Sequence, residues 1–542
     1  MTTNVAQEGF TISFRIDLGG VAADEPLLEA GPLQLALRMA GTAPGLERHD
    51  RDGANYLSFP LPDGSCPAVE ATMAGLRIGI PVGLLARPEG GHDAVIQLAD
   101  THFSIALDGR VDEDMISVPV LEADLSALKT LSPRVSSVRV LVPAVPDALG
   151  RVPDARPVRR SIQYWTPDGH DAWVGDVAPC AFGGRLHVFY LLDRRHHGLK
   201  GGAGGHFFAH LSSADLAHWD EHPHAVPLTE WWTTLGTGTP FEKDGRLCLA
   251  YGLHTDRIVK DGRFPAGGTF AVSDDGIHFS KTGTIFTDAQ NPSVYNRPGG
   301  GYELVTSYGG EKGLFRSDDL KHWTLFDGDL PFRGDCPSLF DWHGRRYLLQ
   351  GFEHMACSPD GLPGSFADWS DAPDAAYDGL SVPMVVPWTG DRRLYVGWLR
   401  HPAGWGGWLT FRELVALPEG RLGMKWVPEI APPVPPVEFC AAAGEPFERR
   451  FVREDGAAPA LVLRVDPATR EASFCDDAPD AAFDARWKAD NVRIGALRGM
   501  DGPYVVRLVV WHESKADATV FDAEIAGGRT LICRRRGRWR LV

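Results

Sequence analysis

The sequence predicts an all-β protein in which a five-bladed β-propeller is flanked by an N-terminal and a C-terminal β-sandwich. Three observations lead to this prediction. Short apolar segments alternate with Gly, Pro, Asp and Asn turns along nearly the whole chain, a strand motif recurs five times in its middle, and Pro-rich stretches border that repeat. Helical periodicity is scarce, and the 61 glycines and 41 prolines suit many tight turns.

The Pro-rich stretches divide the 542 residues into three predicted domains. We expect an N-terminal sandwich over 1–158, the propeller over 159–431 and a C-terminal sandwich over 432–542, because Pro-rich segments form semi-rigid connections. A lectin-like role fits the N-terminal sandwich, although no motif there names a ligand. The candidate strands of the two flanking domains are Phe10–Leu18, Leu33–Arg38, Val95–Leu98, Val138–Val142, Leu461–Val465, Tyr504–Trp511 and Arg529–Arg534.

The composition argues against several classes of function. A formal net charge of −17 disfavours nucleic acid and anionic membranes as partners, since proteins that bind phosphate backbones usually present a basic face. The sequence has no run of about 18 apolar residues and no signal-peptide pattern at its start. None of the eight cysteines forms a C-x-x-C pair, which argues against zinc and redox motifs. Free thiols in a reducing compartment fit best, so we expect a cytoplasmic protein.

The repeated motif is a turn followed by a half-buried strand. Its copies lie at 184–190, 245–251, 301–308, 344–350 and 391–398. A Ser/Asp turn and then an aromatic residue follow most copies, with the aromatic at Trp219, Phe279, Trp323 and Trp369. A spacing of about 40 to 60 residues with several strands per unit is typical of propeller blades, so five copies predict five blades.

A polar residue precedes the motif in every copy. The innermost strand of a propeller blade lines the central channel, so these side chains are expected to converge on one pocket. They are Asp176, Thr239, Asn291, Asp335 and Asp378. Two carboxylates across a small pocket cleave glycosidic bonds, with retention of configuration when they lie about 5 to 5.5 Å apart. An Asp before a turn is often only a turn cap, and the placement of one polar residue per blade is what favours a site.

Several motifs, taken in order, resemble glycoside hydrolase family 32, the invertase, levanase and inulinase family. Trp-Val-Gly-Asp-Val at 173–177 resembles the W-M-N-D-P block, whose Asp is the nucleophile. Gln-Asn-Pro at 290–292 stands where the family has R-D-P, and Asp-Cys-Pro-Ser-Leu-Phe at 335–340 resembles E-C-P-D-L-F, whose Glu is the acid/base. The other similar blocks are Ala209-His210, Asp215–Trp219, Asp378-Gly379 and Arg412–Leu414. The resemblance covers about 160 to 542.

The resemblance implies a five-bladed propeller joined to a C-terminal sandwich, and it implies roles for single residues. Asp176 is the expected nucleophile and Asp335 the expected acid/base. No metal and no cofactor is expected. The residues expected to bind substrate, by hydrogen bonds to hydroxyls or by stacking on sugar faces, are Asn291, Gln290, His210, Thr239, Asp378, Trp173 and Trp405.

Three departures from the family pattern bear on the reaction. Asn291 replaces an Asp and so removes an anion that would stabilise an oxocarbenium-like transition state. Asp335 is shorter than Glu by about 1.5 Å, and Leu191 replaces a polar Gln. These changes suggest a sugar other than ordinary terminal fructofuranose, or a weakened enzyme.

The expected function is a retaining glycosidase acting on fructosides or a related furanoside oligosaccharide, with transfer of sugar to sugar as a side activity. One alternative is a carbohydrate-binding propeller that has lost catalysis. Another is a fructotransferase or lyase on the same scaffold. The expected partner is the oligosaccharide or glycoside substrate, and the sequence leaves the oligomeric state open.

Overall fold

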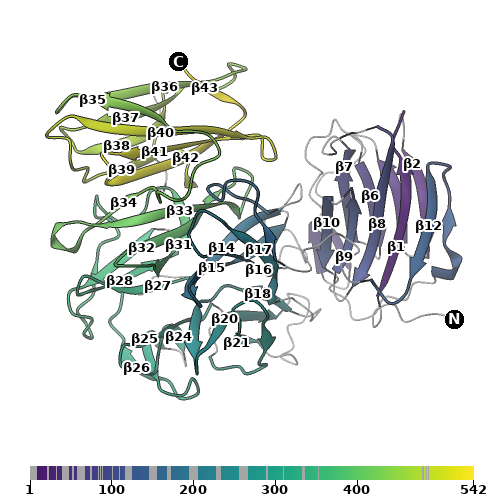
Figure 1. Ribbon diagram of the computed structural model, residues 1–542, viewed down its shortest axis with the longest axis horizontal. Coiled ribbons are helices and arrows are strands. Elements are labelled where there is room, and N and C mark those ends of the chain that lie inside the picture. The colour runs from purple at the N-terminus through teal and green to yellow at the C-terminus, as the bar shows by residue number, and fades with distance from the viewer. Residues whose placement is uncertain are drawn as a thin grey trace.

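The computed structural model of the chain is all-β, as the sequence predicts (Figure 1). Its described residues form strands and two short 3-10 turns, Leu125–Ala127 and Pro418–Gly420, but no α-helix. Within the same residues, no helix has the length and apolarity needed to cross a membrane. The structure describes residues 9–20, 24–31, 33–38, 48–51, 54–57, 68–73, 76–82, 85, 87, 89–99, 102–108, 110–115, 125–145, 155–167, 172–194, 206–226, 233–255, 266–287, 291–308, 311–331, 336–351, 353–478, 481–483, 485 and 488–542.

The N-terminal region contains two five-stranded antiparallel sheets that share one buried core. The first sheet has the order β10 (Arg110–Met115), β9 (His102–Leu107), β8 (Gly91–Ala99), β1 (Phe10–Asp17), β12 (Val135–Leu141). The second has the order β11 (Lys129–Thr130), β2 (Glu25–Ala30), β3 (Leu33–Arg38), β6 (Ala68–Met73), β7 (Leu76–Pro81), and β4 (Arg48–Arg51) pairs separately with β5 (Ala54–Leu57). Alternate residues of β1, from Phe10 to Ile16, enter the shared core, as in a sandwich strand with one buried face.

The middle region repeats one unit, an antiparallel meander of strands that are neighbours in sequence. The first unit consists of β14 (Ala172–Phe182), β15 (Arg185–Arg194), β16 (Phe207–Ser213) and β17 (Asp220–Val226), with β13 (Arg156–Pro157) added to its edge. The second contains β18 (Thr233–Gly236), β19 (Pro240–Lys243), β20 (Arg246–Thr255), β21 (Gly267–Ser273) and β22 (Ser280–Lys281). In the second unit β18 and β19 both pair with β20, as one interrupted first strand.

The next two units have the same strand order. They are β23 (Ser293–Asn296), β24 (Tyr302–Tyr308), β25 (Glu311–Ser317) and β26 (Thr324–Asp327), then β27 (Ser338–Trp342), β28 (Arg345–Gln350), β29 (His354–Ser358) and β30 (Ala367–Asp368). The last meander comprises β31 (Leu380–Pro387), β32 (Arg393–Arg400), β33 (Gly407–Ala416) and β34 (Leu422–Lys425). Its β33 meets β14 through the single pair Val174 and Gly407, which joins the first and last units into a nine-stranded sheet.

The Ser/Asp turns that the sequence repeats have one geometry in the structure. In the turn after β16, the Ser213 hydroxyl accepts the N–H of Leu216, and Asp215 accepts the N–H groups of Ala217 and His218. The turns after β21 and β25 are held in the same way by Ser273 with Asp275 and by Ser317 with Asp319. The repeated Ser/Asp turn is therefore a side-chain-capped turn between the third and fourth strands of a unit.

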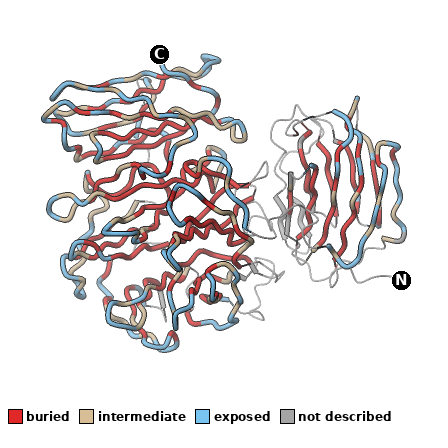
Figure 2. The backbone as a smooth tube through the Cα atoms, in the orientation of Figure 1, coloured by how far each residue is buried: buried red, intermediate tan, exposed pale blue. Residues whose placement is uncertain are grey.

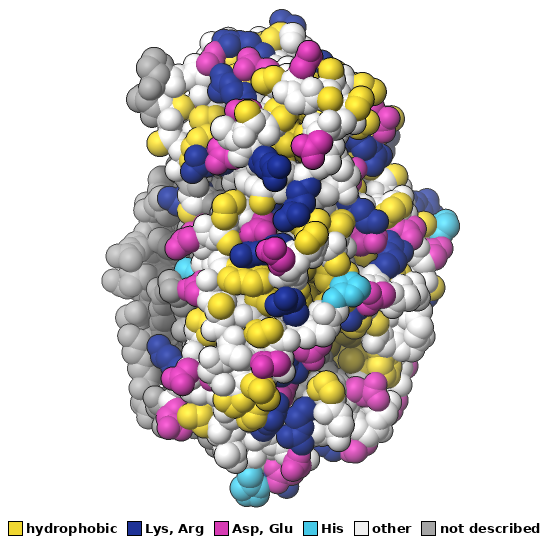
Figure 3. Space-filling model, turned by 90° about the vertical axis from the view of Figure 1, so that its left-hand side faces the viewer, with side chains coloured by type: hydrophobic (Ala, Val, Ile, Leu, Met, Phe, Trp, Pro, Cys, Tyr) yellow, Lys and Arg dark blue, Asp and Glu magenta, His cyan; other side chains and the backbone are white. Residues whose placement is uncertain are grey.

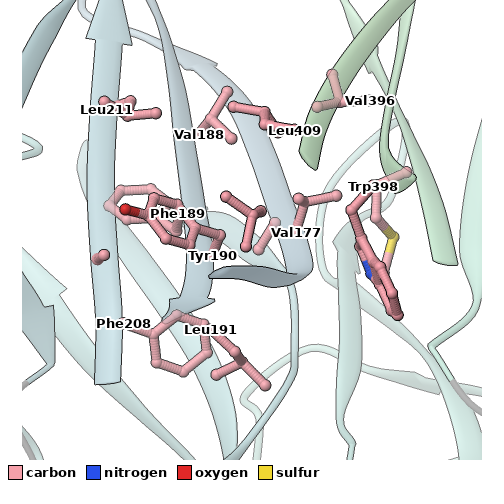
Figure 4. Close-up of a cluster of buried hydrophobic side chains, with 14 of the residues drawn as sticks. Val177, Val188, Phe189, Tyr190, Leu191, Phe208, Leu211, Val396, Trp398 and Leu409 are labelled. Carbon is pink, nitrogen blue, oxygen red and sulfur yellow. The ribbon is translucent and has the colours of Figure 1, made fainter. Parts of the chain in front are cut away.

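The first strands of the units contact one another in a closed circuit. β14 contacts β31 and β19, β31 contacts β27, and β19 contacts β23. Tyr295 of β23 completes the circuit by donating a hydrogen bond to the carbonyl of Pro337, just before β27. The largest buried cluster contains side chains of the first unit and of the last, among them Val177, Tyr190, Val396 and Trp398 (Figure 4). Figure 2 shows the same buried interior running through the strands, with exposure confined to turns and edges.

The C-terminal region is again two antiparallel sheets around one core. The sheets have the orders β35 (Val437–Ala441), β40 (Tyr504–Glu513), β41 (Ala518–Ile525), β42 (Arg529–Arg536) and β39 (Val492–Ile494), β38 (Glu471–Asp476), β37 (Leu461–Asp466), β36 (Phe447–Arg453), β43 (Trp539–Leu541). On the face shown in Figure 3, acidic and basic side chains are interspersed over this region and the middle one. That face carries no continuous basic surface.

Candidate active site

Asp176 lies on a β-bulge near the start of β14. Val174 pairs with Leu192 and Val177 pairs with Tyr190, so Gly175 and Asp176 together oppose Leu191. A bulge turns a side chain away from the regular alternation of the strand, and bulges are common beside active sites. Asp176 keeps only 9% of its surface exposed. The first strand of the last unit is also irregular, between Ser381 and Met384.

The segment that follows Asp335 reaches Asp176. The Cys336 thiol donates to Oδ2 of Asp176 at 3.4 Å, and Cys336 is itself buried in a left-handed backbone conformation with φ of 53°. Asp335, which precedes Cys336 in the sequence, lies outside the described residues. The structure therefore brings Cys336, from the motif that holds the expected acid/base, to the expected nucleophile on β14.

Trp405 packs against the backbone of the bulge. A Cβ placed on Gly175 would lie 2.0 Å from Cη2 of Trp405 and 2.9 Å from the carbonyl oxygen of Leu191, so only glycine fits beside this ring. The Trp405 ring stacks on His206 at 4.8 Å between centroids and meets Trp398 edge-on at 5.5 Å. Trp405 remains half-buried. Trp405 thus places an aromatic ring beside the candidate nucleophile.

Thr239 and Asn291 stand at the start of first strands, as the repeat predicts. The Thr239 hydroxyl donates to the carbonyl of Val294 at 2.7 Å and accepts its N–H at 2.7 Å, so it fastens β19 to β23. With 3% exposure, Thr239 serves mainly as this connection. Asn291 is half-buried and lies two residues before β23, whereas Gln290 lies outside the described residues.

His210 is not at the bulge but inside the first unit. It is fully buried on β16, with its Nε2 2.9 Å from Nδ1 of His187 and its ring stacked on Phe189 and His222. Burial lowers the pKa of His210 well below its usual value, so the ring is neutral. The expectation that His210 binds sugar hydroxyls is corrected by this packing, because protein rings cover its faces.

Asp378 is also placed away from the bulge. Its carboxylate accepts hydrogen bonds from Nε of Arg412 at 2.7 Å and from the Thr530 hydroxyl at 2.7 Å, and its backbone carbonyl accepts the N–H of Ile532. Arg412 bonds Asp522 as well, at 3.0 Å, and all three charged side chains are fully buried. Asp378 therefore belongs to an ion network that joins the last unit to the C-terminal sheets, and this corrects its expected contact with substrate.

Trp173 has a similar structural role. Its ring is 2% exposed and packs on His401 at 4.3 Å and on Trp408 at 5.9 Å. The Nζ of Lys515, from the C-terminal region, lies 4.5 Å from the ring centroid. The expected stacking of Trp173 on sugar is thus replaced by packing within the protein.

A cavity of about 340 Å³ lies at the other end of the first strands. It is lined by residues from β14, β19, β23, β27 and β31, including Cys180, Glu242, Asn296, Asp341 and Val386. Asp176 is near the beginning of β14 and Cys180 is near its end. The bulge and this cavity therefore lie toward opposite ends of the first strands. The strands β14, β19, β23, β27 and β31 therefore line one common space.

Comparison with known proteins points to a single family. Residues 170–363 match the model of the glycosyl hydrolases family 32 N-terminal domain. Sucrose-6-phosphate hydrolase of Bacillus subtilis (strain 168) is 29% identical over 203 residues, which is 33% of this chain and 40% of that protein. The levanbiose-producing levanase of the same organism is 25% identical over 301 residues, covering 50% of this chain and 53% of that protein. The chain thus spans about half the length of these curated relatives.

Solved structures show a similar fold. Sucrose-6-phosphate hydrolase from Lactobacillus gasseri superposes with a TM-score of 0.54 at 15% identity, covering 70% of this chain and 88% of that one. A Bombyx mori β-fructofuranosidase gives a TM-score of 0.50 at 16% identity over 70% of this chain and 90% of that one. The fold is that of an all-β protein built from repeated antiparallel meanders and two flanking sheet pairs. The match to the family 32 N-terminal domain over residues 170–363 agrees with the resemblance predicted from the motifs of this region.

The sequence did not single out Gly175, Cys336, His206 or Asp193 as parts of the site. Gly175 and Cys336 were both visible inside the motifs that carry the resemblance. His206 and Asp193 are found only through the fold, because His206 stacks on Trp405 and Asp193 packs beside His206 and Gly406.

Proposed function

We propose that this protein is a retaining glycosidase that hydrolyses fructosides or a related furanoside oligosaccharide. The observation that carries the proposal is the contact between Asp176 and Cys336, because it joins the segments of both expected carboxylates. The names of the relatives support the substrate class, since they include sucrose-6-phosphate hydrolase, raffinose invertase and levanase. Transfer of the glycosyl group to a second sugar would use the same intermediate.

In the proposed reaction, a carboxylate oxygen of Asp176 attacks the anomeric carbon while the bond to the leaving oxygen breaks. Asp335 gives its proton to that oxygen. Water then attacks the glycosyl ester, loses a proton to Asp335 and releases Asp176. Asn291 supplies a hydrogen bond without a negative charge, so less transition-state charge is stabilised than an Asp would stabilise there. Trp405 offers its ring to the sugar.

We further propose that the repeated units are five blades of one propeller within domains of 1–158, 159–431 and 432–542. The circuit of first-strand contacts supports this division. The pairing of β13 with β17 shows that the chain already contributes to the first unit at Arg156 and Pro157, just before the proposed boundary. We also propose a cytoplasmic location; the described cysteines are all free, which is compatible with it.

The test combines a substrate screen with an Asp176→Asn variant. Purified protein is assayed against sucrose, sucrose 6-phosphate, fructan oligosaccharides and arabinofuranosides, with product mass and anomeric configuration followed by mass spectrometry and NMR. We expect Asp176→Asn to lower kcat by at least about 10³-fold while sugar affinity persists. Asp318→Asn is the matched control, because Asp318 is an exposed acid of the same region, paired with Arg297.

The products separate the alternatives. Hydrolysis adds the mass of water, whereas elimination and transfer do not. A carbohydrate-binding propeller without catalysis, the alternative that Asn291 favours, would bind sugars as wild type and as Asp176→Asn and would turn over none of them. Retention at the anomeric carbon is required, and inversion would reject the nucleophilic role of Asp176.

A further inference from the structure

The N-terminal sandwich is fastened to the middle region by a buried ion pair. Nε of Arg194 lies 3.1 Å from Oε1 of Glu113 on β10, with side-chain exposures of 7% and 2%. Nη1 of Arg194 also donates to the carbonyl of Val111 at 3.2 Å. His102 of β9 packs on Phe207 of β16, with ring centroids 4.7 Å apart. Figure 1 shows β9 and β10 on the side of the sandwich that faces the middle region.

This contact falls at the end of the middle region that carries Asp176. β15 runs antiparallel to β14, so Arg194 pairs with Ala172 and Asp193 with Trp173. Phe207 pairs with Leu192 at the start of β16. The sandwich therefore docks beside the beginning of β14, where the bulge lies, and not at the end that holds the cavity lined by Cys180.

A continuous set of contacts leads from the docking point to the bulge. Asp193, next to Arg194, is fully buried, and its Oδ1 lies 3.7 Å from Nε2 of His206. Gly406, with φ of +78°, packs so closely on Asp193 that a Cβ would lie 2.9 Å from Oδ2. His206 stacks on Trp405, and Trp405 touches Gly175 beside Asp176. Each member of this series touches the next.

We propose that the N-terminal sandwich contributes to the candidate active site. Its Glu113 acts through Arg194, Asp193 and His206 to position the Trp405 ring for stacking on the substrate. This inference rests on the proposed function. Glu113 and His206 are positioning residues, since they touch the support of Trp405 and not the reacting atoms. The sandwich thereby sets affinity for the sugar rather than the rate of bond cleavage.

The physical reason is the burial of the ion pair. Neutralising Glu113 leaves the Arg194 charge buried without its counter-ion, which a protein relieves by letting the charged group move toward water. Arg194 and Asp193 are consecutive on β15, so such a movement displaces the residue that faces both His206 and Gly406. Loss of the fixed ring geometry weakens stacking, which acts in the ground state and the transition state alike and so appears in KM.

The experiment is a double-mutant cycle on the full chain with Glu113→Gln, Trp405→Ala and both together. Glu29→Gln is the control, because Glu29 lies in the other sheet of the same sandwich and pairs with exposed Lys129. We expect Trp405→Ala to raise KM for sucrose about 10-fold and Glu113→Gln about 5-fold, with kcat within about two-fold. In the Trp405→Ala background, Glu113→Gln should add nothing, because its effect passes through that ring.

Two results overturn the inference while the proposed function stands: a KM for Glu113→Gln equal to that of Glu29→Gln, or effects of Glu113→Gln and Trp405→Ala that multiply. If Glu113→Gln does not fold, Arg194→Lys tests the same link, since a single ammonium cannot hold Glu113 and the Val111 carbonyl together as the guanidinium does. If wild-type protein binds sucrose without turning it over, the double-mutant cycle is measured with the Kd for sucrose in place of KM. Absence of both turnover and sugar binding rejects the proposed function, and this inference falls with it.

Discussion

Replacing Arg412 by Leu tests the ion network that holds the C-terminal sheets to the middle region. Arg412 of β33 bonds Asp378 at 2.7 Å and Asp522 at 3.0 Å, and none of the three side chains is exposed. Tyr164 also donates to Asp522, at 2.6 Å. Leu replaces the aliphatic part of the Arg412 side chain but leaves the carboxylates of Asp378 and Asp522 buried without a cation. Breaking a buried ion pair in this way costs about 3–5 kcal/mol.

The pKa of Asp522 gives the pH dependence of this effect. Burial raises the pKa of Asp522 to about 6 even with Arg412 beside it. A carboxyl whose folded pKa is raised contributes most to stability below its unfolded pKa, near 4, and this contribution is lost as pH rises through 6. A rise from 3.8 to about 6 corresponds to about 3 kcal/mol at neutral pH. Without Arg412 the pKa rises further, so the penalty of Arg412→Leu is larger at pH 8 than at pH 5.

The assay is urea unfolding followed by tryptophan fluorescence at pH 8 and pH 5. Arg246→Leu is the control, since Arg246 forms an exposed pair with Asp274 and its loss should cost less than about 1 kcal/mol. Asp522→Asn added to Arg412→Leu should recover part of the lost stability at pH 8. The reasoning is refuted if Arg412→Leu costs no more than the control, or if its cost is the same at both pH values.

Two more predictions concern the buried histidines of the first unit and Asn291. Burial lowers the pKa values of His187 and His222 to about 4, so each contributes stability that is present above pH 6.5 and is lost as pH falls toward 4, by about 3 kcal/mol for each ring. Unfolding free energies measured between pH 7 and 4 should therefore depend less on pH in His187→Phe than in wild type, whereas replacing exposed His218 should not flatten the curve. Asn291→Asp should raise kcat on fructosides about ten-fold or more by restoring an anion near the transition state, and an unchanged or lower kcat in initial-rate assays would contradict that role.

The repeat made much of the middle region predictable because its signals are local. Each Ser/Asp turn is closed by side chains two and three residues away, as in the hydrogen bonds from Ala217 and His218 to Asp215. The residues that form the sequence motif also make the hydrogen bonds of the turn, so the motif predicts where the flanking strands end and begin. The docking of the N-terminal sandwich has no such signal. Glu113 and Arg194 meet only after two separate folds have formed, and neither stands in a recognisable motif.

The predicted site shows where local reasoning stops. Asp176, Thr239 and Asp378 share one position in the repeat, yet their side chains have three different surroundings. A bulge places Asp176 against Cys336, two hydrogen bonds to Val294 turn Thr239 into a fastening between strands, and Thr530, 152 residues away, covers Asp378. The position of a residue in the repeat predicts where its backbone lies. It does not predict which side chains pack on the residue, because these come from distant parts of the chain. The proposed chemistry therefore depends on Asp176 and the segment beside Cys336, and not on a full ring of polar groups.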